Sequence, residues 1–256
     1  MSDSPIDSPT IAFIDGAAKG NPGPGGWGAI VVTPGKSVWH VTELGGGSPH
    51  TTNNRMELSG AIAALQHVAG RSGPVAVYAD STYVIQGITQ WVWGWRKRGW
   101  KTAQGADVLN RDLWEELFGL VAARGRGEVD WRWVRGHVGT PGNERADQIS
   151  VMFALQQDAD LYDGPLDGYR LSILQQLPDD TTLPKRPMGA ASTAGSKAVA
   201  HSYVSVVGGV AMRHRTWAEC ESRVKGQSGA RFKKSANADD ESAILRSWGI
   251  DPSRLL

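Results

Sequence analysis

The chain has 256 residues, a formal net charge of +1, an apolar content of 40% and a single cysteine, Cys220. This length is sufficient for one large domain or two smaller ones, and the apolar content supports a buried core. The near-neutral balance excludes a globally basic surface, so any nucleic-acid-binding surface must be local. One cysteine excludes an internal disulfide framework and favours a reducing compartment, so we expect a cytoplasmic protein.

The N-terminal stretch and the hydropathy of the chain indicate no membrane association. Residues 1–10, MSDSPIDSPT, lack the basic and apolar regions of a signal peptide. Residues 1–9 are polar and interrupted by proline, which predicts a disordered N-terminus. No apolar run reaches the roughly 18 residues that a membrane-spanning helix needs. We therefore expect no membrane partner.

Residues 10–156 have the pattern of a mixed α/β domain. The Gly- and Pro-rich run 17–26 is predicted to be a loop. Ser81 or Thr82 is expected to cap a short helix that continues through 87–91. Apolar and β-branched runs predict strands at 10–14, 27–33, 38–44, 74–79 and 128–134, and helical periodicity predicts helices at 58–68, 107–123 and 143–155. This element order predicts a mixed sheet with helices packed against it.

The composition changes after about residue 156. Residues 157–201 are rich in Pro, Gly, Ser and Ala, and we interpret them as a linker. Within them, apolar residues at 166–177 fit a short helix that either docks on a neighbouring surface or forms only transiently. Order is expected to resume in a small domain at 202–250, with strands at 203–207, 210–214 and 230–234 and helices at 217–224 and 239–248.

Four carboxylates stand near the ends of predicted elements. Asp15 and Asp80 each follow a predicted strand, Glu57 falls in the first turn of a helix whose predicted N-cap is one of residues 51–54, and Asp147 falls in the first turn of the last helix of the domain. If the two strands are neighbours, these side chains converge at one edge. Oxygen ligands without cysteine suit Mg²⁺ or Mn²⁺. The alternatives are that Glu57 only caps its helix, with Asn54, or that the four acids are unrelated surface residues.

His137 lies in a Gly-flanked loop shortly before Asp147. A lone histidine is more often a surface or packing residue than a catalyst. A loop that carries it to a metal site would make it suitable for proton transfer.

Five segments of the chain carry a family resemblance: FIDGAAKGNPGPGGWG, TTNNRMEL, VYADSTYVIQGI, WRKRGWKT and GHVGTPGNERAD. They resemble ribonuclease H type one and cover about residues 10–155 in the order of that family. The resemblance implies the RNase H-like fold, a five-stranded mixed sheet flanked by helices. It also implies an endonuclease that hydrolyses the RNA strand of RNA–DNA hybrids, leaving 5′-phosphate and 3′-hydroxyl ends. The implied ligands of two Mg²⁺ ions, with Mn²⁺ as a possible substitute, are Asp15, Glu57, Asp80 and Asp147, and His137 would assist proton transfer or product release.

The run 91–101, WVWGWRKRGWK, holds four tryptophans and four basic residues and no acid. It is either an exposed amphipathic helix with a snorkelling basic face or a substrate-binding surface. The resemblance implies that it grips the DNA strand, with Lys97 and Arg98 in the basic protrusion and with Trp91, Trp95 and Trp114 lining the channel. The other contacts implied by the resemblance are a DNA-phosphate pocket at Thr52 and Asn110 and RNA contacts from Asn21, Asn53 and Asn54.

The sequence departs from the family pattern at two positions near these contacts. His50 stands where relatives often have a more basic residue, so the charge of the phosphate pocket would depend on pH. Thr82 stands where a longer amide is common, which puts one RNA contact in doubt.

The C-terminal part resembles the hybrid-binding domain of eukaryotic ribonuclease H enzymes through TWAEC, SGARFKK and Tyr203, although that module usually precedes the catalytic domain. It would be a small three-stranded α+β domain. The implied contact residues are Tyr203, Trp217, Phe232, Lys233 and Lys234; the alternative is that Trp217 and Phe232 form a core. We expect a monomer whose partner is an RNA–DNA hybrid duplex. The alternatives are a non-catalytic hybrid or R-loop binder and a fold relative that cuts DNA.

Overall fold

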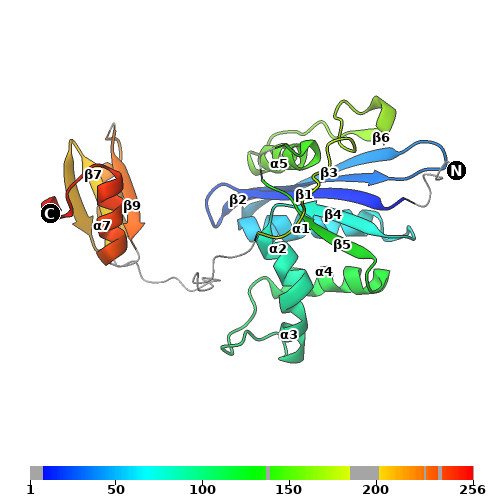
Figure 1. The fold of residues 1–256 in the computed structure, drawn as a ribbon, viewed down its shortest axis with the longest axis horizontal. Helices are drawn as coiled ribbons and strands as arrows, with labels where there is room; N and C mark the ends of the chain where they lie inside the picture. Colours follow the sequence, from blue (N-terminus) through cyan, green and yellow to red (C-terminus); the bar gives the residue numbers. More distant parts are fainter. Residues whose placement is uncertain (1–7, 137–138, 185–201, 228, 236–237, 256) are drawn as a thin grey trace. The chain divides into compact units, whose positions relative to one another are not determined.

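The computed structural model describes residues 8–136, 139–184, 202–227, 229–235 and 238–255. The chain divides into two compact units, Met1–Lys185 and Arg186–Leu256, which we describe separately (Figure 1). The disorder predicted for residues 1–9 falls almost entirely outside the described residues, as does the predicted linker from residue 185 onward.

A mixed sheet forms the centre of the first unit. Its strands are β1 (Thr10–Ala18), β2 (Gly23–Thr33), β3 (His40–Thr51), β4 (Val75–Ala79), β5 (Val129–Trp133) and β6 (Asp163–Pro165). Their order is β5-β4-β1-β2-β3-β6, with β4 parallel to β1 and to β5 and the other pairs antiparallel. The predicted mixed sheet is confirmed, but it has a sixth strand. Because β6 is short and contains Gly and Pro, it lacks the β-branched alternation that identified the others.

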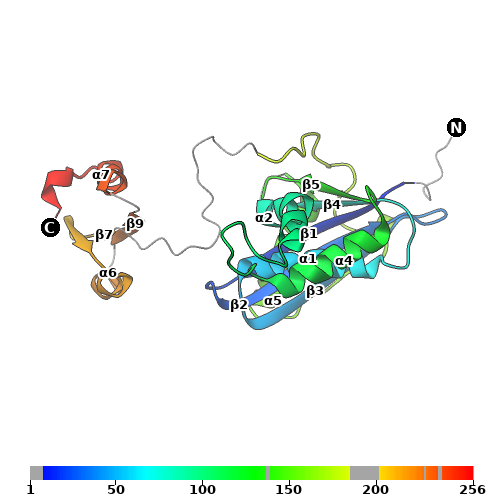
Figure 2. The ribbon, with the colours of Figure 1, turned by 90° about the horizontal axis from the view of Figure 1, so that it is seen from below.

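Helices cover each face of this sheet. They are α1 (Asn53–His67), α2 (Thr82–Gln86), α3 (Val92–Lys97), α4 (Arg111–Arg124) and α5 (Pro141–Ala154), with a π-helical turn at Gly87–Trp91 that joins α2 to α3. Figures 1 and 2 show α1 and α4 side by side on one face, with α5 on the other. Ala12 and Ile14 of β1 pack toward α1 and α4, whereas Ile11 and Phe13 pack in the cluster that contains Ile149 of α5. The central strand is therefore buried on both sides.

The sequence predicted a loop over the whole Gly-rich run at 17–26, but only part of this run is a loop. Ala17 pairs with Gly26 and Ala18 with Gly25, so β1 and β2 continue far into it. A Cβ atom at Gly26 would lie 2.3 Å from the carbonyl oxygen of Ser150. Helix α5 thus lies directly on β2, and glycine serves here to admit a helix backbone rather than to form a turn.

Residues 157–184, which the sequence predicted to be the first part of a linker, belong to the first unit. Tyr169 and Ile173 are buried in the cluster on the α5 face of the sheet, and Leu166, Leu174 and Leu177 pack against it. The helix predicted at 166–177 is wrong, because this segment contains only a 3-10 turn at Leu166–Gly168. Its apolar residues instead follow the surface of the sheet as an irregular chain.

The second unit is a small antiparallel sheet with two helices. It contains β7 (Ser202–Val207), β8 (Val210–His214), β9 (Arg231–Ser235), α6 (Trp217–Val224), α7 (Ala238–Ser247) and a 3-10 turn at Pro252–Arg254. The strand order is β8-β7-β9. Val204 and Val206 of β7 form its core with Ile244 and Leu245 of α7. The predicted three-stranded α+β unit is present within a residue or two of its expected boundaries.

Among the helices of the described residues, none combines the length and the apolar character that crossing a bilayer would require.

Candidate active site

Two of the candidate carboxylates follow directly from the register of adjacent parallel strands. Ile14 of β1 pairs with Ala79 of β4, so Asp15 and Asp80 occupy the next position along each chain. The sequence predicted Asp15 at the end of the first strand, but β1 continues past it to Ala18. Positions in register on neighbouring parallel strands lie side by side, which brings the two acids together.

Glu57 reaches the same place because helix α1 begins against β1. A Cβ atom at Gly16 would lie 2.2 Å from the backbone nitrogen of Glu57. Thr52 caps the helix, and its hydroxyl accepts from the Arg55 amide at 3.4 Å. Because the helix starts at Asn53, Glu57 lies beyond the first turn where it was predicted, and the capping box with Asn54 is not formed.

Two donors orient the Glu57 carboxylate. Asn53 Nδ2 donates to Oε1 at 2.8 Å, and the Ser81 hydroxyl donates to Oε2. Ser81 also caps α2, where its hydroxyl accepts from the Val84 amide. The sequence predicted the cap but not the contact with Glu57, because a capping position says nothing of which side chain lies across the site.

Asp80 and Asp147 complete the arrangement. Trp133 Nε1 donates to the carbonyl oxygen of Asp80 at 3.1 Å, and a Cβ atom at Gly136 would lie 2.4 Å from Asp80 Oδ2. Asp147 lies in the second turn of α5 rather than the predicted first turn, because the helix already begins at Pro141. Its charge helps to raise the pKa of Asp15, so it faces the same site.

The electrostatics are those of several acids in a partly enclosed space. Burial raises the pKa of Asp15 to about 8, and the charges of Asp80 and Asp147 add to this effect. Burial likewise raises the pKa of Glu57 to about 8, with further contributions from Asp80 and Asp15. Asp15 Oδ1 accepts from the Gly16 amide at 2.6 Å, whereas Oδ2 is buried and has no hydrogen-bond partner among the described residues. Such a group is costly without a cation.

The donor chemistry fits a hard divalent cation. Four carboxylates supply only oxygen, and Asp15 presents a buried oxygen that no group in the described part of the chain satisfies. No group of three or more His, Cys, Asp or Glu side chains within the described ranges has the spacing of a formed metal site. The charges of the neighbouring acids are thus near enough to raise the pKa of Asp15 and of Glu57, but the acids of the described residues are not closed around an ion.

His137 lies outside the described residues, so its role stays a prediction. Its neighbours on the chain flank the site: Gly136 contacts Asp80, and the Gly139 amide donates to Glu144 of α5 at 2.8 Å.

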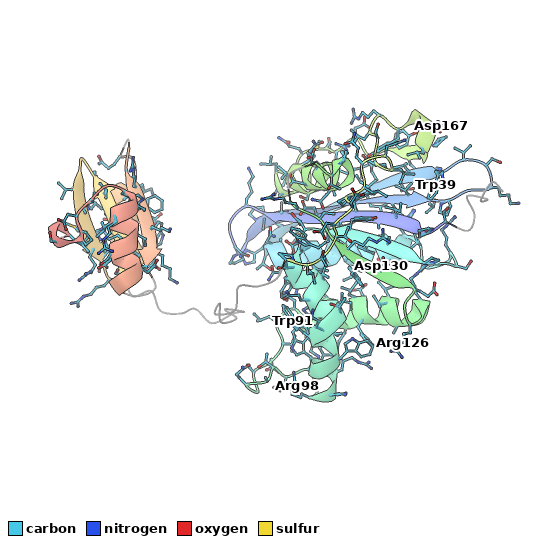
Figure 3. The ribbon with its side chains drawn as sticks, viewed as in Figure 1. Trp39, Trp91, Arg98, Arg126, Asp130 and Asp167 are labelled. Atoms are coloured by element: carbon cyan, nitrogen blue, oxygen red, sulfur yellow. The ribbon has the colours of Figure 1, made fainter. Side chains whose placement is uncertain are left out.

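The end of the π-helical turn and the basic segment that follows it project from the first unit. Figure 3 shows Trp91 and Arg98 on this projection, away from the sheet. Trp91 and Trp95 are half-buried, with ring centroids 5.8 Å apart, while Lys97 and Arg98 are exposed. Trp114 is fully buried beneath Trp95, so the expectation that it lines a channel is corrected: it packs behind the half-buried ring of Trp95.

The predicted phosphate-pocket residues are linked by one arginine. Thr52 caps α1 beside Arg55, and Arg55 Nη1 donates to Asn110 Oδ1 at 3.5 Å. Asn110 Nδ2 donates to the Tyr83 hydroxyl at 3.3 Å, a partner that the sequence did not suggest. The helix predicted at 107–123 begins only at Arg111, because Asn110 has a left-handed backbone conformation with φ 58°.

The predicted RNA contacts lie close to the start of α1. Gly23 pairs with Thr51, which brings the turn containing Asn21 beside Asn53 and Asn54. Asn21 and Asn54 are exposed, whereas Asn53 is half-buried through its bond to Glu57.

Three aromatic side chains form a row on the second unit. Tyr203 and Trp217 have centroids 5.7 Å apart, and Trp217 and Phe232 are 5.3 Å apart. Trp217 is 40% exposed and Phe232 49% exposed, so neither is a core residue. Lys234 pairs with Tyr203 and shares its face, whereas Lys233 pairs with Val204 and lies on the α7 face.

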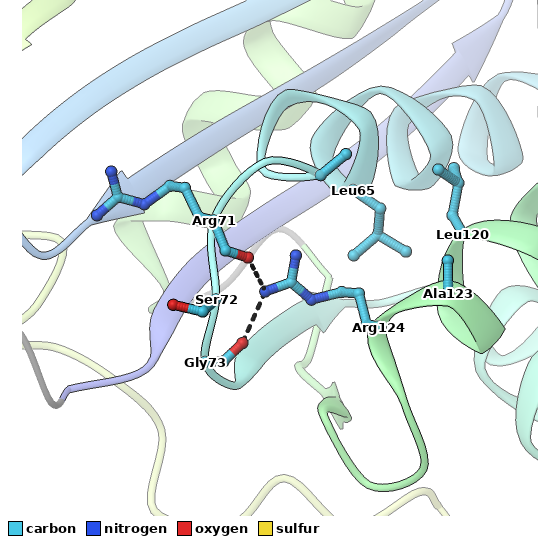
Figure 4. A pocket seen from close by; sticks show the side chains of 8 residues that line it. Leu65, Arg71, Ser72, Gly73, Leu120, Ala123 and Arg124 are labelled. Atoms are coloured by element: carbon cyan, nitrogen blue, oxygen red, sulfur yellow. Dashed lines mark hydrogen bonds between the residues drawn. The ribbon is translucent and has the colours of Figure 1, made fainter.

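A separate hollow lies where α1 and α4 end. Figure 4 shows Leu65, Arg71 and Leu120 around it, with Arg124 donating to the carbonyl oxygens of Arg71 and Gly73. Arg124 also donates to the Val68 carbonyl, so it satisfies the backbone after α1. The residues that line this hollow include no carboxylate, and we interpret the hollow as a structural feature.

The fold of the first unit is the RNase H fold. The solved structure of LC9-RNase H1, a type 1 RNase H with the type 2 active-site motif, matches with a TM-score of 0.52 and 36% identity over 60% of this chain and 76% of that one. The foamy viral protease-reverse transcriptase matches with a TM-score of 0.50 at 17% identity over 59% of this chain and 21% of that one, which shows the fold alone.

The RNase H family model matches residues 7–154, more than half of the chain, and the chain therefore belongs to the RNase H family. Ribonuclease HI of Pseudomonas aeruginosa is 54% identical over 140 residues, covering 55% of this chain and 89% of the relative. Ribonuclease H of Polaromonas naphthalenivorans is 48% identical over 157 residues, covering 59% and 93%. The chain is accordingly a nuclease, and hence a hydrolase. The family match ends before the second unit.

Proposed function

We propose that this chain hydrolyses the RNA strand of RNA–DNA hybrids and that Asp15, Glu57, Asp80 and Asp147 hold two divalent cations in doing so. The observation that carries the proposal is the buried, unpartnered Oδ2 of Asp15 beside acids that raise its pKa. The ribonuclease H names of its relatives support the substrate class. The products would carry 5′-phosphate and 3′-hydroxyl ends.

The residues have distinct tasks in this mechanism. Cations held by these four carboxylates would supply activation of the attacking water and stabilisation of the leaving oxygen. Asp15 and Glu57 act as carboxylates, so a cation must offset the burial that favours their neutral forms. Asn53 and Ser81 donate to the two oxygens of Glu57 and hold its orientation. No nucleophilic Ser or Cys is needed, and His137 would move a proton or assist product release.

Substrate selection would use the two strands differently. The exposed Lys97 and Arg98 suit DNA phosphates, and the half-buried rings of Trp91 and Trp95 suit contact with deoxyribose. RNA would be read through its 2′-hydroxyl groups by the amides near the start of α1, Asn21, Asn53 and Asn54. Thr52 and Asn110 would bind a DNA phosphate.

The second unit would act as a hybrid-binding module. Its exposed Trp217 and Phe232, with Lys234 on the same face, combine stacking surfaces with a phosphate-binding charge. A second site on one chain raises the effective concentration of the catalytic unit on a long duplex.

The decisive experiment compares cleavage of a labelled hybrid, an RNA duplex and a DNA duplex, with and without Mg²⁺. We expect hybrid cleavage only with Mg²⁺. Asp15→Asn should abolish cleavage but leave hybrid binding measurable, because it removes one ligand charge and keeps the shape. Asp167→Asn, at an exposed acid of the same unit, is the control and should cleave normally.

Other outcomes of this assay would contradict the proposal in distinct ways. Full activity of Asp15→Asn would refute the metal role of that residue. Hybrid binding without any cleavage would indicate a non-catalytic binder, and cleavage of the DNA duplex would indicate a DNA-cutting relative.

A further inference from the structure

Residues 157–184 form a strap that extends beyond the family match and reaches each edge of the main sheet. At one edge β6 of the strap pairs with β3, with His40 opposite Pro165. At the other edge the Trp133 amide of β5 donates to the carbonyl oxygen of Thr181 at 3.1 Å. Between these contacts the strap crosses the α5 face, where Tyr169 is buried.

A buried polar cluster ties the strap to α5. Arg145 Nε and Nη2 donate to the two oxygens of Glu43, each at 2.8 Å, in a bidentate pair. The Tyr169 hydroxyl donates to Glu43 Oε1 at 2.6 Å. Arg145 Nη2 also donates to the Asp160 carbonyl, and the Tyr162 amide donates to Glu43 Oε2. A buried ion pair holds a defined geometry only when such additional bonds satisfy it.

The cluster lies two residues from a candidate metal ligand. Arg145 precedes Asp147 on α5 and points to another side of the helix, because successive helical residues are separated by about 100°. The ion pair between Arg145 and Glu43 of β3 fixes the rotation of α5 about its axis and its position along the sheet. A Cβ atom at Gly28 would lie 2.3 Å from the Ala146 carbonyl oxygen, so α5 rests on β2 at the same level. The position of Asp147 follows from these two contacts.

We propose that Tyr169 is a positioning residue for Asp147, acting through Glu43 and Arg145; this rests on the proposed function. The Tyr169 hydroxyl orients the carboxylate of Glu43, and this carboxylate orients the guanidinium group of Arg145. The guanidinium group in turn fixes the position of the α5 turn that carries Asp147. The family match ends at residue 154, so Tyr169 lies outside the matched region, whereas Glu43 and Arg145 lie inside it.

The test compares Tyr169→Phe with Tyr162→Phe. Each substitution removes one hydroxyl from the strap, and the two rings lie 5.0 Å apart, but the Tyr162 hydroxyl donates to the Pro165 carbonyl rather than to Glu43. In Tyr169→Phe we expect the affinity for Mn²⁺ in the absence of substrate to weaken about tenfold. Electron paramagnetic resonance measures this affinity. The Mg²⁺ concentration for half-maximal hybrid cleavage should rise by a similar factor, with the KM for hybrid unchanged. Tyr162→Phe should match the wild type.

Hydrogen exchange supplies a readout of position. Amides of residues 144–147 should exchange faster in Tyr169→Phe than in Tyr162→Phe if the first turns of α5 lose their support. Arg145→Lys keeps the charge but loses the bidentate fork, so it should shift Mn²⁺ binding in the same direction and provides a second variant if Tyr169→Phe does not fold.

If Tyr169→Phe or Arg145→Lys folds and binds Mn²⁺ like the wild type, the inference is overturned, even if the melting temperature of that variant falls. The cluster would then serve stability alone. A wild-type protein that binds Mn²⁺ but does not cleave hybrid would overturn the proposed function instead. The two failures are therefore distinguishable.

Discussion

The carboxyl groups of Asp15 and Glu57 give the free energy of unfolding a characteristic pH dependence. Burial raises the pKa of each to about 8. Carboxyl groups of the unfolded chain titrate near pH 4, so between about pH 4 and about pH 8 the folded protein keeps protons that the unfolded chain has released. Without divalent cations, the stability that these groups contribute is present at low pH and is lost as pH rises through about 8.

Asp15→Asn should therefore gain stability relative to the wild type as pH rises, because asparagine stays neutral where aspartate must ionise. We expect the difference in melting temperature, measured in EDTA, to widen from about pH 5 to about pH 9 and to narrow when Mg²⁺ is added. A melting-temperature difference that is constant across this range would contradict the raised pKa of Asp15 and the burial that is its main cause.

Gly16 is the contact that brings Glu57 to Asp15. Gly16→Ala would place a Cβ atom 2.2 Å from backbone nitrogen, which cannot yield as a flexible side chain can. We expect a loss of about 1–3 kcal/mol in the free energy of unfolding and a marked loss of cleavage, because the two carboxylates move apart.

Gly119→Ala on the exposed side of α4 is the matched control. Nothing lies within 4 Å of its Cβ position, so it should stabilise the protein by about 0.5–1 kcal/mol. Urea unfolding and hybrid cleavage of the two variants measure the contrast, and equal behaviour would show that the close approach has no role.

At the scale of elements, the segment from α2 through α3 combines support and charge. Trp114 of α4 lies beneath Trp95, and Arg96 lies 4.0 Å from the centroid of the Phe118 ring. These contacts hold a projecting helix whose exposed end carries Lys97 and Arg98. Such an element contributes charge to binding without contributing to chemistry.

Lys97→Glu should therefore raise the KM for hybrid while kcat stays within about twofold of the wild type. The slope of log affinity against log salt should fall by about 1, the value for one lost phosphate contact. Lys36→Glu, in the exposed turn between β2 and β3, makes the same charge change elsewhere and should leave the KM unchanged. A fall in kcat alone would place Lys97 in the chemistry and contradict this assignment.

At the scale of the whole molecule, the two units have separate cores and, in our proposal, separate tasks on one duplex. Deleting residues 202–256 should weaken binding and make cleavage more dependent on hybrid length, because the second attachment is lost. Cleavage kinetics on short and long hybrids measure this effect.

Trp217→Ala in the full chain should reproduce most of that loss on long hybrids. Val210→Ala truncates another exposed apolar side chain of the same unit and should not. Unchanged kinetics of the deletion on both lengths of hybrid would reject the module's role.

The local pattern of residues was enough to predict most strands, most helices and the region of each acid. Periodic burial depends on near neighbours in the chain, which is why β4, β5 and the elements of the second unit appear close to where they were expected. Helix starts were less accurate, because Thr52 and Asn110 end the preceding conformation through their own backbone geometry.

Only the tertiary structure decided which residues meet. Glu43 lies 102 positions from Arg145 and 126 from Tyr169, so no local pattern could reveal their cluster or the strap that it anchors. The contact of Ser81 with Glu57 and the burial of Trp114 likewise depend on elements that pack after they form. The sequence by itself determined the family, the acids available and the order of elements. The packing of distant segments decided their orientation, because contacts between distant residues depend on the folded path of the chain.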